Sequence, residues 1–170
     1  IMIKKKDIIL IGYSGHSYVC IDTIKLNQFN IKGYCDSLLK ESNPYFLNYL
    51  GDEEKYQIQK NDFFFISIGE NTIRKNIYNK LKTNNFINVI HSSSNISESV
   101  FIKENSNVLV NANVVINAQS KICKGVILNT GAIIEHECKI GDFSHIGPGA
   151  VICGNVNIGE RTFVGSNTVK

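Results

Sequence analysis

The sequence predicts a subunit in two parts, a small α/β domain with a parallel sheet over residues 1–92 and a three-sided parallel β-helix over residues 93–170. Two observations carry this prediction. Apolar segments alternate between strand and helix spacing up to about residue 91, and beyond residue 110 a branched aliphatic residue recurs at every sixth position. The composition, 43% hydrophobic and 19% charged, is that of a globular protein.

The amino-terminal half alternates between strands and helices. Periodicity predicts strands over 7–11, 31–36, 61–69 and 87–91, and helices over 17–29 and 71–81. In the second helix Ile73, Ile77 and Leu81 fall on one face. Such alternation is typical of a Rossmann-like parallel sheet with crossover helices.

From residue 110 the period of the sequence is six. Branched aliphatic residues occupy positions 110, 116, 122, 128, 134, 140, 146, 152, 158 and 164, and a small or β-branched residue follows four positions after each. Ile96, Ile102 and Val108 keep the step but are offset by two. We therefore expect a local irregularity near residues 108–110.

Neither a helix, with 3.6 residues per turn, nor a strand, with a period of two, explains a sustained period of six. A hexapeptide that forms a short strand and then turns a corner does explain it, because three such units complete a triangular coil. The large aliphatic residue then points into the prism and the small one fits near the corner. Asn and Gly in the strings LNTG and GPGA suit corners with unusual φ.

Composition excludes several classes of protein. The 18 basic and 15 acidic residues give a net charge of +3, too weak for a nucleic-acid-binding surface. The five cysteines form no CxxC pair, which argues against a zinc knuckle, a dithiol redox site and a disulfide framework. The first apolar run, Ile8–Ile11, is too short for a signal peptide or a membrane span, so we expect a soluble cytoplasmic protein.

His136 stands out among the residues of the repeat. Ile134 and Cys138 take the inward positions of its hexad, so the imidazole, flanked by Glu135 and Glu137, should lie outside the core. Transfer of an acetyl group to an amine or hydroxyl needs a base for the nucleophile's proton, and an imidazole with a pKa near 6.5 is suited to that role. A neighbouring carboxylate would orient the ring and raise its basicity.

The period of six over residues 96–170 resembles that of the hexapeptide-repeat acyltransferases, which implies a left-handed β-helix. The strings ILNTGAIIEHEC, IGDFSHIGPGA and GNVNIG resemble, more narrowly, the sialic acid O-acetyltransferase family of sugar acetyltransferases, and most closely the bacillosamine-type UDP-sugar N-acetyltransferases.

That resemblance implies roles for five residues of the β-helix. His136 would be the catalytic base and Glu137 would increase its basicity. His145, Gly154 and Ser166 would contact acetyl-CoA, with a backbone N–H near Gly154 placed to hold the thioester oxygen.

Two other chemistries remain open for this region. An acyl-cysteine intermediate on Cys138 is disfavoured, because this position should be buried and a buried neutral thiol is a poor nucleophile. A zinc site between subunits, as in the gamma-type carbonic anhydrases, needs three histidines, and the repeat offers His136 and His145 alone. We expect direct transfer and no metal.

The string ILIGYSGHS joins the first strand to a helix, so backbone N–H groups of residues 14–17 would face an anion. It is not the GxGxxG dinucleotide fingerprint. The family resemblance implies that nucleotide-sugar is bound by Ser14, Gly15, His16, Asp36, Ser37 and Gly69. Relatives often carry two acids where this chain has Asp36 and Ser37, and Arg74 would support the loop rather than touch ligand.

The sequence therefore predicts a homotrimeric enzyme that transfers acetyl from acetyl-CoA to the amine of a UDP-linked 4-amino-sugar, with active sites between subunits. The alternatives are O-acetylation of sialic acid or another sugar hydroxyl and, more remotely, a non-catalytic trimeric scaffold. Which sugar is the acceptor stays open at this stage.

Overall fold

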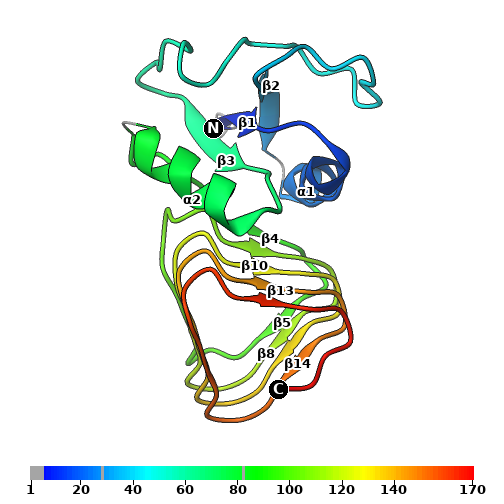
Figure 1. Ribbon diagram of the computed structural model, residues 1–170, viewed down its shortest axis with the longest axis vertical. Helices are drawn as coiled ribbons and strands as arrows, with labels where there is room; N and C mark the ends of the chain where they lie inside the picture. The colour runs from blue at the N-terminus through cyan, green and yellow to red at the C-terminus, as the bar shows by residue number, and fades with distance from the viewer. Residues whose placement is uncertain (1–5, 28, 82) are drawn as a thin grey trace, which may run out of the picture.

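The computed structural model describes residues 6–27, 29–81 and 83–170. An α/β part sits on top of a triangular coil, as predicted (Figure 1). Within the described residues, no helix is long and apolar enough to cross a membrane.

The α/β part is built on a three-stranded parallel sheet in the order β2-β1-β3. Its strands are β1 (Asp7–Ile11), β2 (Asn30–Cys35) and β3 (Phe63–Ile66), and its helices are α1 (Gly15–Leu26) and α2 (Asn71–Lys80). Parallel bridges from Tyr34 to Tyr49 and from Phe64 to Phe86 extend both edges. Because β1 is central, its side chains are buried on both sides.

The two helices cover opposite faces of this sheet. Ile8 and Leu10 of β1 pack with Cys20, Ile21 and Ile24 of α1. On the other face, Ile9 and Ile11 pack with Phe64 and Phe86, and Ile77 and Leu81 join this cluster from α2 and the residue that follows it. Ile73 differs from the prediction, because it is 49% exposed at the start of α2 and packs against neither cluster.

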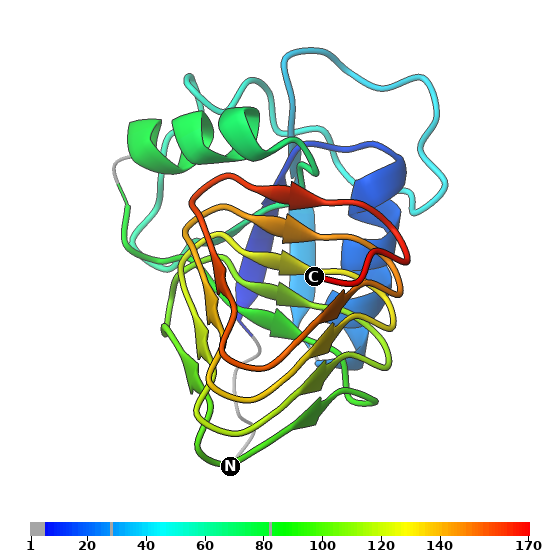
Figure 2. The same cartoon turned by 60° about the horizontal axis from the view of Figure 1, so that its bottom comes forward.

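The β-helix has three parallel sheets of two-residue strands (Figure 2). Sheet I holds β4 (Val89–Ile90), β7 (Leu109–Val110), β10 (Ile127–Leu128), β13 (His145–Ile146) and β16 (Phe163–Val164). Sheet II holds β5 (Asn95–Ile96), β8 (Val115–Ile116), β11 (Ile133–Ile134) and β14 (Val151–Ile152). Sheet III holds β6 (Phe101–Ile102), β9 (Lys121–Ile122), β12 (Lys139–Ile140) and β15 (Asn157–Ile158).

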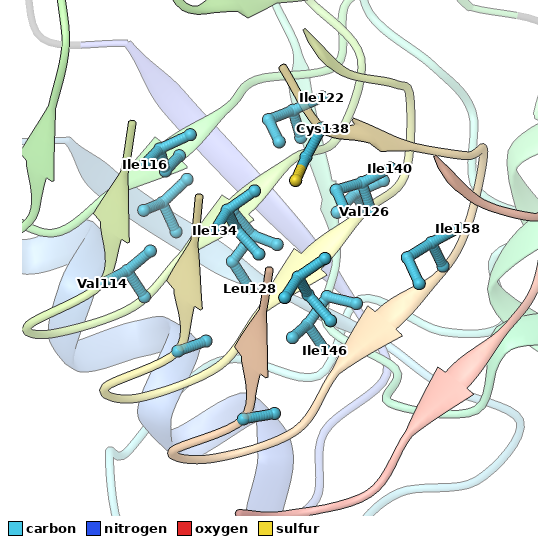
Figure 3. Packing of buried hydrophobic residues seen from close by; sticks show 14 of the residues in the cluster. Val114, Ile116, Ile122, Val126, Leu128, Ile134, Cys138, Ile140, Ile146 and Ile158 are labelled. Atoms are coloured by element: carbon cyan, nitrogen blue, oxygen red, sulfur yellow. The ribbon is translucent and has the colours of Figure 1, made fainter. Parts of the chain in front are cut away.

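The interior of the prism is the predicted aliphatic column. The repeated aliphatic residues from Val110 to Val164 are buried in one cluster, together with small residues such as Ala132, Cys138 and Ala150 (Figure 3). Successive coils pair in register, so that Leu128 of β10, for example, lies beside Ile146 of β13. The three-sided coil expected from the period of six, and the left-handed parallel β-helix that the family resemblance implied, are confirmed.

The predicted irregularity lies between β6 and β7. The inward residues Ile102 and Val110 are separated by eight positions instead of six, and Val108 is also buried in the column. Asn105 and Asn107 both adopt positive φ in this longer connection. The two extra residues therefore fit without interrupting the core.

The corners share one backbone conformation. In every hexad from Asn113 to Asn167, the third residue after the inward aliphatic has φ between +55° and +68°. Gly125, Gly131 and Gly149 take this position without steric cost, as the sequence indicated. Glu137 takes it too, with φ of +59°.

The strand expected over 87–91 is divided between the two parts of the molecule. Ile87 N donates to Phe64 O at 3.0 Å, which places this residue at the edge of the amino-terminal sheet. β4, in contrast, pairs with β7 in sheet I. The prediction that this strand belongs to the α/β sheet is thus wrong for Val89 and Ile90, because they form the first strand of the prism, ahead of residue 93.

The two parts share a continuous interface. Val89, Leu109 and Ile127 point outward from sheet I into the same apolar cluster as Ile21 and Ile24 of α1. The α/β domain therefore buries one face of the prism.

The side chain of Arg74, on α2, crosses this interface and is fully buried. Its hydrogen bonds, 2.8 to 3.0 Å long, reach the carbonyls of Ile68, Gly69, Gly125 and Phe143 and the Oδ1 of Asn71. Burial lowers the pKa of Arg74 to about 10, which leaves the guanidinium charged at neutral pH. The expectation that Arg74 supports the loop agrees with these contacts.

Replacing Arg74 by methionine should destabilise the protein by roughly 3–5 kcal/mol, because the four carbonyls lose their donor while the site stays buried. Urea unfolding at fixed protein concentration measures this. Arg161→Met, at a corner where the side chain is exposed, is the matched control and should change the stability by about 0.5 kcal/mol or less. Equal effects of the two substitutions would contradict the role of Arg74.

Candidate active site

His136 follows β11, at the corner between sheets II and III. Ile134 and Cys138 on either side are buried in the prism, whereas the side chain of His136 is 60% exposed, as the register predicts. Its Nδ1 lies 3.0 Å from Oε2 of Glu137. Because a carboxylate only accepts hydrogen bonds, Nδ1 carries a proton, and in the neutral ring Nε2 is the free base.

Gly154 lies one coil further along the same corner. A Cβ atom built on Gly154 would lie 2.6 Å from Nε2 of His136, so only glycine leaves room for the ring. This contact places the backbone of residue 154 beside the basic nitrogen. The role predicted for it, donation to a thioester oxygen, stays a prediction.

Glu135 is fixed by the coil beneath it. Asn117 Nδ2 donates to Glu135 Oε2 at 2.9 Å, and Ser120 Oγ donates to Glu135 O at 2.7 Å. The residue before His136 is therefore held on both its backbone and its side chain.

Cys138 is 1% exposed, and burial raises the pKa of its thiol. Its Sγ lies 3.1 Å from the carbonyl of Cys153. The predicted burial is confirmed, and a protonated thiol inside the prism is a poor nucleophile.

The amino-terminal turn lies at the carboxyl end of β1. Ser14 and Gly15 are exposed, and α1 begins at Gly15, so the amino terminus of this helix lies at the surface. Gly12, with φ of +89°, passes so close to Ile68 that a Cβ atom would lie 2.4 Å from Ile68 Cγ1. This close approach brings the turn against the loop after β3.

Asp36 and Ser37 follow β2 at the same end of the sheet. The carboxylate of Asp36 accepts hydrogen bonds from Tyr13 N at 3.0 Å and Ser37 Oγ at 3.3 Å, and it forms an ion pair with Lys40 at 2.9 Å. Ser37 is exposed. Both residues are thus gathered beside the turn, although Asp36 also has contacts of its own within the protein.

Gly69 completes this group. A Cβ atom on Gly69 would lie 3.6 Å from Cγ of His16, so the loop after β3 touches the first turn of α1. The predicted nucleotide-sugar residues therefore meet at the carboxyl edge of the parallel sheet, the place where such sheets bind ligands.

His145 lies with this group and not with His136. It points outward from sheet I toward the α/β domain, is 8% exposed, and its ring centroid is 6.0 Å from that of His16 and 5.1 Å from that of Phe163. A groove of about 340 Å³ at this junction is lined by Gly69, Glu70, Asn71, His145 and Phe163. Its predicted contact with acetyl-CoA stays a prediction.

Ser166 is exposed at the corner between sheets I and II, after β16. A single chain therefore places the predicted residues at three positions around the prism. The nucleotide-sugar residues and His145 lie at the domain junction, Ser166 lies on the next corner, and His136, Glu137 and Gly154 lie on the corner after that.

Burial also sets the charge state of the junction. Desolvation lowers the pKa of His16 and of His145 to about 4, so both rings are neutral at neutral pH. Neutral rings at this position suit hydrogen bonding and packing rather than charge pairing with a diphosphate.

Three residues of the junction were not predicted from the sequence. Asn71 Nδ2 donates to the carbonyls of Arg161 and Thr162, Phe163 lines the groove, and Asn129 Nδ2 contacts Nε2 of His145 at 3.1 Å. Asn129 belongs to the string LNTG, which indicated only a corner. Phe163 carried a signal, because it is a large apolar residue at an outward position of the repeat.

Within the described residues, no group of three or more His, Cys, Asp or Glu side chains is arranged to hold a metal ion. His136 and His145 lie on different sides of the prism. The described residues of a single chain therefore provide no set of ligands for the zinc site considered above.

Known families match both parts of the chain. Residues 7–81 match the family described as PglD N-terminal domain, and residues 137–169 match the bacterial transferase hexapeptide (six repeats).

Solved structures match nearly the whole chain. A histidine-to-asparagine mutant of perosamine N-acetyltransferase from Caulobacter crescentus, in complex with CoA and GDP-perosamine, is 28% identical with a TM-score of 0.83, covering 96% of this chain and 88% of that one. The acetyltransferase domain of PglB from Neisseria gonorrhoeae, in complex with acetyl coenzyme A, is 25% identical with a TM-score of 0.85, covering 97% and 82%. WeeI from Acinetobacter baumannii, at 16% identity and a TM-score of 0.53, shares the fold.

The fold and the exposed histidine at a prism corner define a hexapeptide-repeat protein with a PglD-type amino-terminal domain. Both parts of the chain therefore resemble the hexapeptide-repeat sugar acetyltransferases, the family that its motifs indicated.

The two buried histidines predict a pH dependence of stability. Their pKa values fall from 6.5 in the unfolded chain to about 4 in the folded one, so the unfolded state binds more protons between these values. The contribution of the two neutral rings to the free energy of unfolding should therefore be complete above pH 6.5. The free energy of unfolding should fall by roughly 2–4 kcal/mol as the pH decreases toward 4.

Urea unfolding at pH 7.5 and pH 5.0 measures this loss. The double variant His16→Gln, His145→Gln should show a smaller difference between the two pH values, whatever its stability at pH 7.5. The same difference in wild type and variant would exclude these histidines as its source.

Proposed function

We propose that this protein transfers the acetyl group of acetyl-CoA to the amine of a nucleotide-linked 4-amino-sugar, with UDP as the nucleotide. The observation that carries the proposal is the pair His136 and Glu137. The ring lies outside the prism, its Nδ1 faces the carboxylate at 3.0 Å, and its Nε2 faces the space over Gly154. The proposal is also supported by the similarity of this chain, at 28% identity, to a perosamine N-acetyltransferase whose structures contain CoA and GDP-perosamine.

In the proposed reaction, His136 Nε2 removes a proton from the sugar amine as the nitrogen attacks the thioester carbonyl. Glu137 stabilises the imidazolium that forms, because its carboxylate accepts from Nδ1. When the tetrahedral intermediate collapses, the C–S bond breaks, and the thiolate of coenzyme A leaves and takes up a proton. The backbone N–H near Gly154 is placed in this proposal as a donor to the developing oxyanion.

The nucleotide-sugar is assigned to the carboxyl edge of the parallel sheet. Ser14 and Gly15 present the first turn of α1, whose free N–H groups attract a diphosphate. Asp36 and Ser37 lie beside that turn and Gly69 lies across it, next to His16. His145, Gly154 and Ser166 remain the proposed acetyl-CoA contacts.

We propose a homotrimer, and the separation of these groups supports it. The amino-terminal site lies over sheet I, whereas His136 is at the opposite corner of the prism, so an acceptor held by one chain needs the base of another. The outer face of sheet II supports this, since Val115, Ile133 and Val151 alternate there with the buried aliphatic residues and are only partly buried. In a ring of three chains, such heterologous contacts would close.

The cytoplasm is the compartment we propose, because acetyl-CoA and nucleotide-sugars are both available there. The intact contact of His136 with Glu137 argues against a scaffold without chemistry. An O-acetyltransferase would use the same base on a hydroxyl, so the acceptor decides between these two reactions.

His136→Asn should lower kcat by about 10² to 10⁴, the range for loss of a general base, while the melting temperature changes little because the side chain is exposed. Glu137→Gln should lower kcat less, by about tenfold, since the ring stays in place. His91→Asn, at the residue after β4, is the matched control. Unchanged turnover in His136→Asn would remove this residue from the mechanism.

The acceptor is tested by mixing the protein with acetyl-CoA and following release of free thiol. A UDP-4-amino-sugar should release thiol, and GDP-linked amino sugars test how strictly UDP is required. Thiol release with sialic acid or another hydroxyl acceptor, and none with an amine, would replace the proposed reaction by O-acetylation.

A further inference from the structure

Asn129, at the corner after β10, contacts His145, which lines the groove between the two domains, but it has no part in the proposed reaction. We propose that Asn129, held by Asn111, is a positioning residue that fixes the tautomer of His145 and thereby the wall of that groove. The effect on catalysis rests on the proposed function, whereas the effect on the tautomer does not.

The orientation of the Asn129 amide is set by two donors. Its Oδ1 accepts from Asn111 Nδ2 at 3.0 Å and from Thr130 N at 2.8 Å. Since an amide nitrogen cannot accept these bonds, the oxygen must point to them and Nδ2 must point to His145. Nδ2 lies 3.1 Å from Nε2 of His145 and can only donate. Nε2 is therefore the acceptor, and the proton of the neutral ring is on Nδ1.

The other side of the ring agrees with this assignment. Nδ1 of His145 faces Gly69 O at 3.4 Å, and a carbonyl can only accept. This hydrogen bond is long, so the shorter contact with Asn129 is the stronger constraint. Gly69 O also accepts from Arg74 Nη1 at 3.0 Å. The carbonyl of Gly69 is thus shared between the imidazole and the guanidinium.

Asn111 lies one coil below Asn129 and is 1% exposed. Its amide could not be reversed, because its oxygen would then face the oxygen of Asn129. Its own Oδ1 finds no hydrogen-bond partner among the described residues. Asn111 therefore donates to Asn129, and Asn129 donates to His145, so both amide orientations are fixed.

Burial and the nearby cation of Arg74, on α2, favour the neutral form of His145. His16 faces the ring from α1, and the carboxylate of Glu70, which shares the groove at the start of α2, acts in the opposite direction. Protonation would put a hydrogen on Nε2 against the N–H of Asn129 and a second cation beside Arg74. His145 is therefore a neutral donor to Gly69 rather than an acid or a base. It shapes the groove that it lines together with Gly69, where it is the proposed contact for acetyl-CoA.

The substitution Asn129→Asp tests this with almost no change of shape. A carboxylate accepts where the amide donated, so Nε2 of His145 should take up a proton while Gly69 O keeps the proton on Nδ1. In ¹⁵N spectra of the histidine rings, wild-type His145 should show the Nδ1–H tautomer, and the variant should show an imidazolium at neutral pH. The chain has four histidines, and His145→Gln identifies the signal.

Kinetics supply the second measurement. Asn129→Asp should raise KM for acetyl-CoA, which His145 is proposed to contact, about tenfold or more and change kcat less, because the base His136 is elsewhere. Asn157→Asp, the same substitution on the exposed side of β15, is the matched control and should match wild type in spectra and kinetics.

An Nε2–H tautomer in the wild type, or a ring that stays neutral in Asn129→Asp, would overturn the proposal. An imidazolium in Asn129→Asp without a change in KM would overturn the positioning role of Asn129. If the wild type has no acetyltransferase activity, the proposed function fails while the spectra still decide the tautomer. Should Asn129→Asp not fold, Asn129→Ser should give a mixture of tautomers, and a single Nδ1–H form there would contradict the role of Asn129.

Discussion

The buried guanidinium of Arg74 is the contact on which the arrangement of the two domains depends. A charge in this position is stable only when fully hydrogen-bonded, and its partners are carbonyls from the loop after β3 and from two prism corners. Because the same guanidinium binds carbonyls of the loop and carbonyls of the rigid prism corners, it fixes the position of the loop relative to the prism as well as to its own sheet. Gly69, next to the proposed acceptor site, is one of those partners.

The prism supplies the second constraint. Its coils repeat one backbone, in which an inward aliphatic is followed by an outward pair and a corner residue with positive φ. His136 and Glu137 occupy the outward and corner positions, so a polar pair is presented to solvent without disturbing the aliphatic column. The stacking of coils then brings Gly154 against the ring. The imidazole proposed as the base is thereby fixed by the same periodicity that stabilises the fold.

The two histidines of the repeat lie in different environments. His136 is exposed with a carboxylate at its Nδ1, which leaves Nε2 free to take a proton. His145 is buried, and both of its ring nitrogens have partners, Asn129 and Gly69. The residues that surround an imidazole, rather than its place in a motif, thus separate a candidate base from a candidate support.

The amino-acid sequence alone was enough to predict the prism, its aliphatic interior, the irregularity before Val110 and the outward position of His136, because each follows from a local period of six. It also placed the turn at Ser14 to His16 at the end of a strand. The contacts of the folded chain were needed to show that β4 belongs to the prism, that Ile73 is exposed, and that His145 joins His16 and Gly69 instead of His136. Those outcomes depend on which face of the prism the α/β domain covers, and that choice is made by contacts between residues far apart in the chain, such as Arg74 with Phe143 and His145 with Gly69.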